Sequence, residues 1–230
     1  MQKEEINEER EGRKGLKTGR VGIYGGTFDP VHIGHLISAE AVYHACDLDK
    51  VVFIPAYNPP HKKNRSINAQ ARLAMLKLAT EDNDHFEVDD REILSKEVNY
   101  TLNTILDLRA EHPDLDFYYI MGEDSLLQVE QWYEWKKLLS LIRLVVVKRP
   151  RSQDIAYGSV DADRKTMTDQ VNFLRGLGYE LTVVDQFAVD ISSSSLREYL
   201  REGRDTRYLI PDKVLDYIKG ENLYDQPESK

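Results

Sequence analysis

Short apolar runs alternate with longer amphipathic stretches along most of the chain. The runs are rich in Val, Ile, Phe and Tyr, and several contain no polar position, which is typical of parallel strands that are covered on both faces. The stretches between them carry apolar residues at helical spacing. Strands are therefore expected at residues 21–24, 50–55, 85–88, 116–122, 143–150 and 181–185.

Helices are expected between these strands and after the last of them. Residues 34–46 separate the first two strands, and such a strand–helix–strand unit should have a right-handed crossover. Asn68 and Thr101 are expected to cap two further helices. The expected helical segments are 34–46, 68–80, 101–112, 124–130, a stretch through 172–178 and a segment that begins at Ser192 or Ser193. The alternation predicts an α/β fold with a parallel sheet.

The first strand leads into two glycines and two histidines, in residues 20–36, RVGIYGGTFDPVHIGHL. Gly25 and Gly26 are expected to turn with positive φ and to let a ligand approach the backbone. The next helix begins with free N–H groups, which suit a phosphate. His32 and His35 are expected on one helix face, where they could grip one group. A zinc site and a purely structural histidine pair are the alternatives, and the GxGxxG and P-loop patterns do not fit.

Polar residues also follow other strands at the edge where open α/β sheets bind ligands. The loop after the second strand carries Lys62, and the fifth strand ends in Lys148 and Arg149. The fourth strand is followed by Gly122 and Asp124. Asp124 is expected to meet a ribose hydroxyl or a metal-bound water, to cap the next helix, or to do both.

A serine run and an aromatic cluster complete the candidate residues. The run at 192–195 precedes an amphipathic helix that carries Arg197 one turn inside, so it predicts a second anion site. A capped loop without a ligand is the alternative. Trp132 and Tyr133 could stack on a planar ring, whereas Trp135 is assigned to the core.

The composition narrows the class of protein. A chain of 230 residues with 41% hydrophobic content can form one substantial core. The net charge of −9 argues against a nucleic-acid partner. No apolar window is long enough for a membrane span, and the N-terminus lacks the apolar centre of a secretory signal. The single cysteine, Cys46, excludes an internal disulfide framework and fits a reducing, cytoplasmic location.

Five separated motifs resemble the HxGH nucleotidyltransferases, and in particular their nicotinate-nucleotide adenylyltransferase branch. The motifs are GGTFDPVHIGH at 25–35, PPHK at 59–62, the Trp132–Tyr133 pair, ISSSSLR at 191–197 and the tail RYLIPDKVLDYIKGENLY at 207–224. The resemblance implies a doubly wound, Rossmann-like parallel sheet of the HxGH type with a small C-terminal helical segment. A single domain is expected at 20–224, between a charged tail at 1–19 and a polar tail at 225–230.

The resemblance also implies a reaction, which is adenylyl transfer from ATP to nicotinate mononucleotide in NAD biosynthesis. Mg²⁺ is expected to arrive with ATP. The residues expected to act in catalysis are His32, His35, Lys62 and Arg197. Those expected to bind ATP are Gly25, Gly26, Thr27, Phe28, Gly122, Asp124, Ser193, Ser194 and Ser195. Those expected to bind the mononucleotide are Tyr100, Thr101, Trp132, Tyr133 and Arg149.

Two positions depart from the family pattern. Asn99 stands where serine is frequent, and Ser194 replaces the usual threonine of ISST. Three other functions stay open: another HxGH transferase acting on phosphopantetheine or glycerol phosphate, a non-catalytic nucleotide sensor on the same fold, and a zinc-binding interaction protein. A homo-oligomer is compatible with the sequence.

Overall fold

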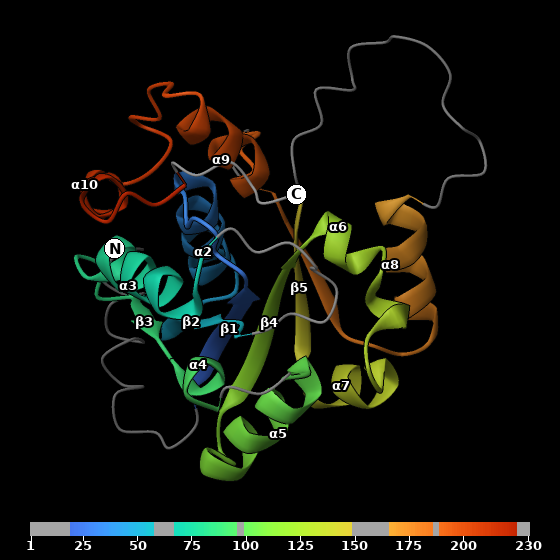
Figure 1. The fold of residues 1–230 in the computed structure, drawn as a ribbon. Helices are drawn as coiled ribbons and strands as arrows, with labels where there is room; N and C mark the ends of the chain where they lie inside the picture. The colour runs from blue at the N-terminus through green and yellow to red at the C-terminus, as the bar shows by residue number, and fades with distance from the viewer. Residues whose placement is uncertain (1–18, 58–66, 96–98, 149–165, 186–188, 225–230) are drawn as a thin grey trace, which may run out of the picture.

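A six-stranded parallel sheet forms the centre of the molecule, with helices on both faces (Figure 1). The structure is a computed structural model that describes residues 19–57, 67–95, 99–148, 166–185 and 189–224. The strands are β1 (Arg20–Gly26), β2 (Lys50–Pro55), β3 (Phe86–Val88), β4 (Asp116–Gly122), β5 (Arg143–Lys148) and β6 (Leu181–Asp185). All six expected strands are present, and the predicted α/β class is confirmed.

The helices surround this sheet in chain order (Figure 1). The first half of the chain contributes α2 (Ile33–Ala45), α3 (Ala69–Thr80), α4 (Arg91–Ser95) and α5 (Thr101–Glu111). The middle of the chain contributes α6 (Glu123–Leu126), the 3-10 helix η1 (Val129–Gln131), α7 (Trp135–Leu141) and α8 (Met167–Gly176). The chain then adds α9 (Ser193–Arg201) and α10 (Asp212–Gly220), which form the expected C-terminal helical segment.

Alternate residues of the central strands pack into two separate cores. In β5, Val145 and Val147 belong to the cluster that includes residues of α2, α3 and α10. Leu144 and Val146 belong to the cluster on the other face, with residues of α5, α7 and α8. Burial on both faces explains why this strand is apolar almost throughout.

Three local predictions need correction. Thr101 is not a helix cap, because α5 begins at Thr101 and Tyr100 is the N-cap residue; the Thr101 side chain instead hydrogen-bonds Tyr119. The expected helix at 124–130 is divided into α6 and η1. The five-residue α4 is not among the expected helices, since such a short, polar segment shows no helical period; its one fully buried side chain is Ile93.

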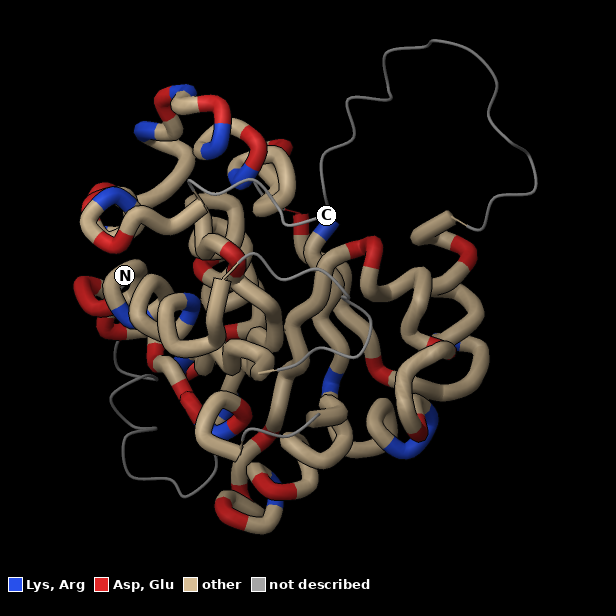
Figure 2. The backbone as a smooth tube through the Cα atoms, in the orientation of Figure 1, with Lys and Arg blue, Asp and Glu red and all other residues tan. Residues whose placement is uncertain are grey.

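The strand order places the two halves of the sheet around β1. The order is β3-β2-β1-β4-β5-β6, so the chain winds in one direction from β1 to β3 and then returns to start β4 beside β1. In doubly wound sheets of this kind, ligands bind at the carboxyl ends of the strands where the winding reverses. Figure 2 shows that charged residues lie mainly on helices and loops, while the central strands carry few.

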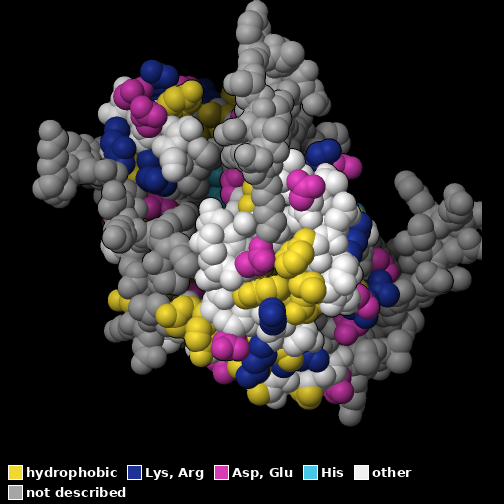
Figure 3. Space-filling model, turned by 90° about the vertical axis from the view of Figure 1, so that its right-hand side faces the viewer, with side chains coloured by type: hydrophobic (Ala, Val, Ile, Leu, Met, Phe, Trp, Pro, Cys, Tyr) yellow, Lys and Arg dark blue, Asp and Glu magenta, His cyan; other side chains and the backbone are white. Residues whose placement is uncertain are grey.

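The described surface carries several exposed hydrophobic side chains. The largest exposed fractions among the large ones belong to Tyr208, Leu94, Tyr133 and Leu177. In the view of Figure 3, hydrophobic side chains gather between acidic and basic ones. Within the described ranges, no helix combines the length and the apolar character needed to cross a bilayer. A homo-oligomer stays a prediction.

Candidate active site

A cavity of about 870 Å³ opens at the carboxyl ends of β1 and β4, where the winding reverses. Its walls come from the ends of these strands and from the first turns of α2, α5, α6 and α9. The expected site residues that line it are Gly25, Gly26, Thr27, Phe28, His32, His35, Tyr100, Thr101, Gly122, Asp124, Trp132, Tyr133, Ser193, Ser194 and Arg197. Residues that are far apart in the sequence therefore meet around one space.

Three of the expected site residues are not part of this wall as it is described. Lys62 and Arg149 lie outside the described residues. Ser195 is not brought to the cavity, because its hydroxyl is 2.8 Å from the Ser192 Oγ atom and its backbone N–H donates to the same oxygen. Ser192 is thus the N-cap of α9 and Ser195 belongs to that cap.

The two glycines that end β1, Gly25 and Gly26, lie close to neighbouring side chains. A Cβ atom on Gly25 would lie 2.6 Å from the Tyr119 hydroxyl oxygen, so only glycine fits there. The expected positive φ is not found at Gly25 or Gly26; the backbone takes it at Phe28, with φ of 49°. Phe28 is buried, and its ring meets His35 edge to face at 5.1 Å between centroids. The buried Phe28 ring therefore fixes the conformation of the turn after β1.

The two histidines form a stacked pair at the start of α2. Their ring centroids are 3.7 Å apart with planes 26° from parallel. His32 is the N-cap residue, one position before the helix, and its side chain is buried. A Cβ atom on Gly34 would lie 3.0 Å from the His32 Nδ1 atom, which explains the glycine between the two histidines.

One hydrogen bond defines the tautomer of His35. The backbone N–H of His32 donates to the His35 Nδ1 atom at 3.2 Å. A nitrogen that accepts carries no proton, so the ring proton of His35 is on Nε2 while this bond is present. His35 then offers one N–H donor through Nε2, and it lines the cavity.

The serine motif is bonded directly to the histidine motif. The Arg197 guanidinium donates from Nη1 to the Asp29 carbonyl oxygen at 2.8 Å and from Nη2 to the Ser194 Oγ atom at 3.2 Å. The Ser193 hydroxyl donates to the Pro30 carbonyl oxygen at 3.0 Å. The N-terminus of α9 and its arginine are therefore fixed beside the N-terminus of α2, and the two predicted anion sites are parts of one wall.

Arg72 is a site-supporting residue that the sequence reading missed. Its guanidinium is fully buried and donates to the carbonyl oxygens of Thr27 at 2.6 Å, Ala56 at 2.7 Å and Tyr57 at 3.3 Å. These carbonyls belong to the segments that leave β1 and β2, so one side chain ties both together. The available signal was its spacing, since Arg72 lies three residues after Ala69 and four before Leu76 on the buried face of α3.

Tyr224 is a second supporting residue, and no local pattern in the sequence indicates it. Its buried hydroxyl donates to the Asp29 Oδ1 atom at 2.7 Å, across 195 positions of the chain. Burial, together with the neighbouring Asp29 carboxylate, raises the pKa of the Tyr224 hydroxyl, so it stays a donor. The C-terminal segment therefore fixes Asp29, whose carbonyl in turn holds Arg197.

We expect Tyr224→Phe to lower the free energy of unfolding by about 1.5–3 kcal/mol, because a hydrogen bond to a buried carboxylate is lost while the ring still packs. Urea denaturation would measure this change. Tyr217→Phe on α10 is the matched control, since no hydrogen bond of its hydroxyl is found among the described residues. Equal midpoints for the two variants would show that the Tyr224–Asp29 bond contributes nothing.

Four aromatic residues from β4, the start of α5 and the segment around η1 also line the cavity. Trp132 meets Tyr119 edge to face at 5.9 Å between centroids, and Tyr100 lies against Tyr133 at 4.6 Å with planes 33° apart. Trp135 is half-buried and packs at the edge of the core against Tyr179, so its assignment to the core holds in part. Trp132 is half-buried and Tyr133 is exposed, and both side chains line the cavity.

The acidic residue after β4 lies at the cavity but does not cap a helix. Gly122 is the N-cap residue of α6, and Asp124 is exposed in its first turn. Of the two predictions made for Asp124, the capping one is wrong. Its position on the cavity wall keeps a ribose hydroxyl or a metal-bound water as its expected partner.

The fold and this cavity define an α/β nucleotidyltransferase of the HxGH class. The sequence profile described as cytidylyltransferase-like matches residues 23–199. The chain belongs to this family. A protein of Aeromonas salmonicida described as "Probable nicotinate-nucleotide adenylyltransferase" is 40% identical over 207 residues, which cover 89% of this chain and 96% of that protein. A protein of Bacillus cereus with the same description is 38% identical over 90% of this chain and 98% of its own length.

The fold is shared with solved structures at lower sequence identity. The Plasmodium falciparum nicotinic acid mononucleotide adenylyltransferase complexed with NaAD aligns with a TM-score of 0.70 at 19% identity, over 92% of this chain and the whole of that chain. The same enzyme complexed with APC aligns with a TM-score of 0.66 at 18% identity, again over 92% of this chain. At this level of identity the likeness concerns the fold alone.

Proposed function

We propose that the protein transfers the adenylyl group of ATP to nicotinate mononucleotide, releasing pyrophosphate and forming nicotinate adenine dinucleotide. The observation that carries the proposal is the wall in which Arg197 bonds Asp29 beside the stacked histidines. Donors that suit a triphosphate and aromatic side chains that suit a pyridine ring line the same cavity, and this supports the proposal. The relatives in this family carry the name of the same activity.

The chemistry needs positioning more than it needs a base. The second pKa of a phosphate monoester is about 6, so the nucleophile is largely a dianion at neutral pH. A phosphate oxygen of the mononucleotide attacks the α-phosphorus of ATP in line, a P–O bond forms, and the bridge to the β-phosphate breaks with its electron pair leaving on pyrophosphate. No proton must be removed first. The protein's task is to hold two anions together and stabilise the charge of the leaving group.

The described residues can share this task. His35, through its Nε2–H, and His32 face the space where the α-phosphate would lie. Arg197 and the first turn of α9 suit the β- and γ-phosphates, because a guanidinium fork and a helix N-terminus both match phosphate oxygens. Lys62 is proposed to hold the incoming phosphate, and Arg149 to contact the mononucleotide.

Mg²⁺ is proposed to come with the triphosphate and to neutralise part of its charge. The residues fit an ion that the substrate brings. Three carboxylates line the cavity as it is described. Asp29 accepts a hydrogen bond from Tyr224, Glu92 accepts one from Thr104, and Asp124 is exposed. In the described part of the chain no group of three His, Cys, Asp or Glu residues could hold a metal ion. Magnesium bound to nucleotides keeps several waters and needs few protein ligands.

The pyridine ring is proposed to stack on Trp132 or Tyr133, with its carboxylate at the N-terminus of α5 near Tyr100 and Thr101. No side chain caps that terminus at Tyr100, so its first N–H groups can receive an anion. The location is proposed to be cytoplasmic. Cys46 is a half-buried free thiol, and burial raises its pKa.

The test is pyrophosphate release from ATP with Mg²⁺ and, in separate reactions, nicotinate mononucleotide, nicotinamide mononucleotide and phosphopantetheine. We expect release with the nicotinate form and none with ATP alone. Faster release with phosphopantetheine would assign a different transferase activity. ATP binding without release in any reaction would instead favour the nucleotide sensor.

A further inference from the structure

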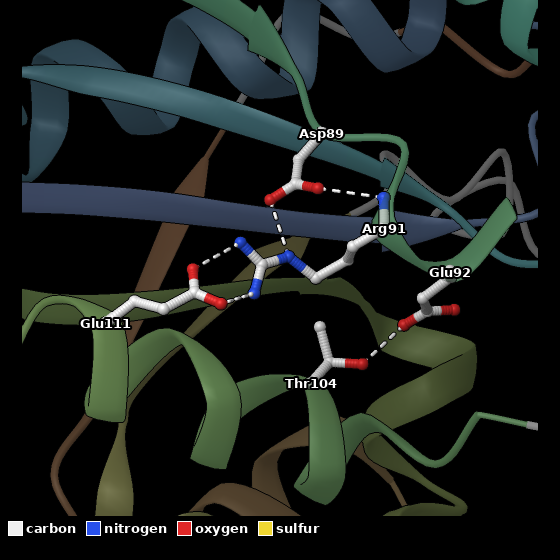
Figure 4. A network of polar contacts seen from close by, with 5 residues as sticks. All are labelled: Asp89, Arg91, Glu92, Thr104 and Glu111. Atoms are coloured by element: carbon white, nitrogen blue, oxygen red, sulfur yellow. Dashed lines mark hydrogen bonds and ion pairs between the residues drawn. The ribbon is translucent and has the colours of Figure 1, made fainter. Parts of the chain in front are cut away.

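A polar network fixes α4 between β3 and α5 (Figure 4). Arg91 donates to Asp89 from its backbone N–H at 2.9 Å and from Nε at 2.6 Å. The same guanidinium donates to both carboxylate oxygens of Glu111, at the end of α5, at 3.2 and 2.9 Å. Arg91 is therefore bonded to the segment after β3 and to the end of α5, and this fixes the start of α4, where Glu92 is the next residue.

Glu92 turns from this network toward α5. Its Oε1 atom accepts a hydrogen bond from the Thr104 hydroxyl at 2.7 Å (Figure 4). Glu92 is only 9% exposed, yet it lines the nucleotide cavity together with Tyr100 and Thr101. Thr104 lies three residues after Thr101, which is about 4.5 Å along a helix. A buried carboxyl group thus lies beside the helix end proposed to receive the ring carboxylate.

The surroundings of Glu92 raise the pKa of its carboxyl group above the ordinary value. Burial raises the pKa of its carboxyl group and nearby Asp89 raises it further, while the Thr104 hydrogen bond and Arg91 lower it in part. Among the described residues, the other elements around α4 present further groups that can carry charge. From β4, Tyr119 lies near Glu92, and burial raises the pKa of its hydroxyl, so it stays neutral. From α3, Lys77 pairs with Asp90 and Arg72 is bonded to main-chain carbonyls.

A second carboxylate in the same cavity changes this balance. Two carboxylates that share a site with little water cannot both be ionised without a large cost, so one of them gains a proton. An uncharged pyridine amide imposes no such cost. The ring substituent should therefore determine whether Glu92 is protonated in the complex.

We propose that Glu92 is a specificity-determining residue that takes up one proton from solvent when nicotinate mononucleotide binds and none when nicotinamide mononucleotide binds. This inference rests on the proposed function. The carboxylate and a solvent proton give a neutral carboxyl group, whose O–H can donate to the ring carboxylate while Oε1 keeps the Thr104 hydrogen bond. An ionised Glu92 would repel the acid and accept the amide, so its protonation state selects between the two rings.

The experiment is isothermal titration calorimetry of both mononucleotides at one pH, in buffers of different ionisation enthalpy. The slope of the observed enthalpy against the buffer enthalpy gives the protons taken up. Both ligands carry the same phosphate, so proton exchange at the phosphate and at the histidines cancels in their difference. We expect a larger uptake for the nicotinate form, by up to one proton, and a Kd that rises up to about tenfold per pH unit once Glu92 ionises in the free protein.

Two variants identify the group. Glu92→Gln keeps an acceptor for Thr104 and an N–H donor toward the cavity but cannot titrate, so the difference in proton uptake should vanish and the Kd should lose this pH dependence. Glu111→Gln is the matched control, because Glu111 belongs to the same network but not to the cavity wall, and the difference should persist.

The outcomes separate this inference from the proposed function. Equal proton uptake for the two ligands, or an uptake difference that persists in Glu92→Gln, would overturn the role of Glu92 even if pyrophosphate release with the nicotinate form is normal. Failure of both mononucleotides to bind would overturn the proposed function, and this inference with it.

Discussion

Arg197→Ala is expected to slow pyrophosphate release about 10²–10³-fold, equivalent to about 2.7–4 kcal/mol in the barrier. The guanidinium donates hydrogen bonds to the Asp29 carbonyl and the Ser194 hydroxyl, so its orientation is fixed before ATP binds. Its charge should count most when the β-phosphate departs, because negative charge develops there in the transition state. The effect is therefore expected mainly on kcat, measured by steady-state pyrophosphate release.

Two further variants make this prediction specific. Arg197→Lys keeps the charge but loses the planar fork, so activity should be restored only in part. Arg201→Ala removes an exposed arginine one turn later on α9 that does not line the cavity, and it should leave kcat within about twofold of the wild type because no phosphate-binding group is removed. If Arg201→Ala were as slow as Arg197→Ala, the loss would reflect damage to α9 and not the departure of pyrophosphate.

The sheet and much of the site could be predicted because their signals are local. An apolar strand followed by glycine and a polar residue is visible in a few consecutive positions, and parallel strands bring such ends together at one edge. His35 was located in this way, and Ser193 and Arg197 were located by the serine run before an amphipathic helix. The structure places all three on one cavity.

The residues that support the site could not be predicted in the same way. Tyr224 acts on Asp29 from the far end of the chain, and no spacing connects them. Arg72 is one of several helical arginines in the sequence, and its three carbonyl acceptors come from segments that only the fold brings beside α3. Glu92 lies in a short helix that the periodicity did not show, because five residues do not complete two helical turns.

The positive φ expected of the glycines was also placed wrongly. Sequence reasoning assigned it to Gly25 and Gly26 because glycine adopts it without strain. In the fold the side chains above β1 leave no room for a Cβ atom at Gly25, and the left-handed conformation falls on Phe28, whose ring is buried. The two glycines correctly predicted that another group approaches the backbone closely, and they wrongly predicted a positive φ at their own positions. Only the tertiary packing distinguishes these two reasons for a glycine.

His35→Ala is expected to lower kcat by about 10²–10³-fold as well, because it removes an N–H donor from the phosphate site. We expect the ring to have two separate functions, since Nδ1 accepts from the His32 backbone, which leaves the proton on Nε2, and His35 lines the cavity. Alanine removes both functions. Amide side chains can separate them, because the asparagine side chain reaches as far as Nδ1 and the glutamine side chain as far as Nε2.

His35→Asn should therefore keep the contact with the His32 backbone and the thermal stability, yet be nearly as slow as His35→Ala. His35→Gln should recover part of kcat, because its amide N–H can occupy the place of the Nε2 donor. Steady-state pyrophosphate release and thermal melting of the three variants measure the two functions independently. The reverse order, with asparagine fast and glutamine slow, would mean that His35 acts by holding His32 and its backbone, and that His32 alone contacts the α-phosphate.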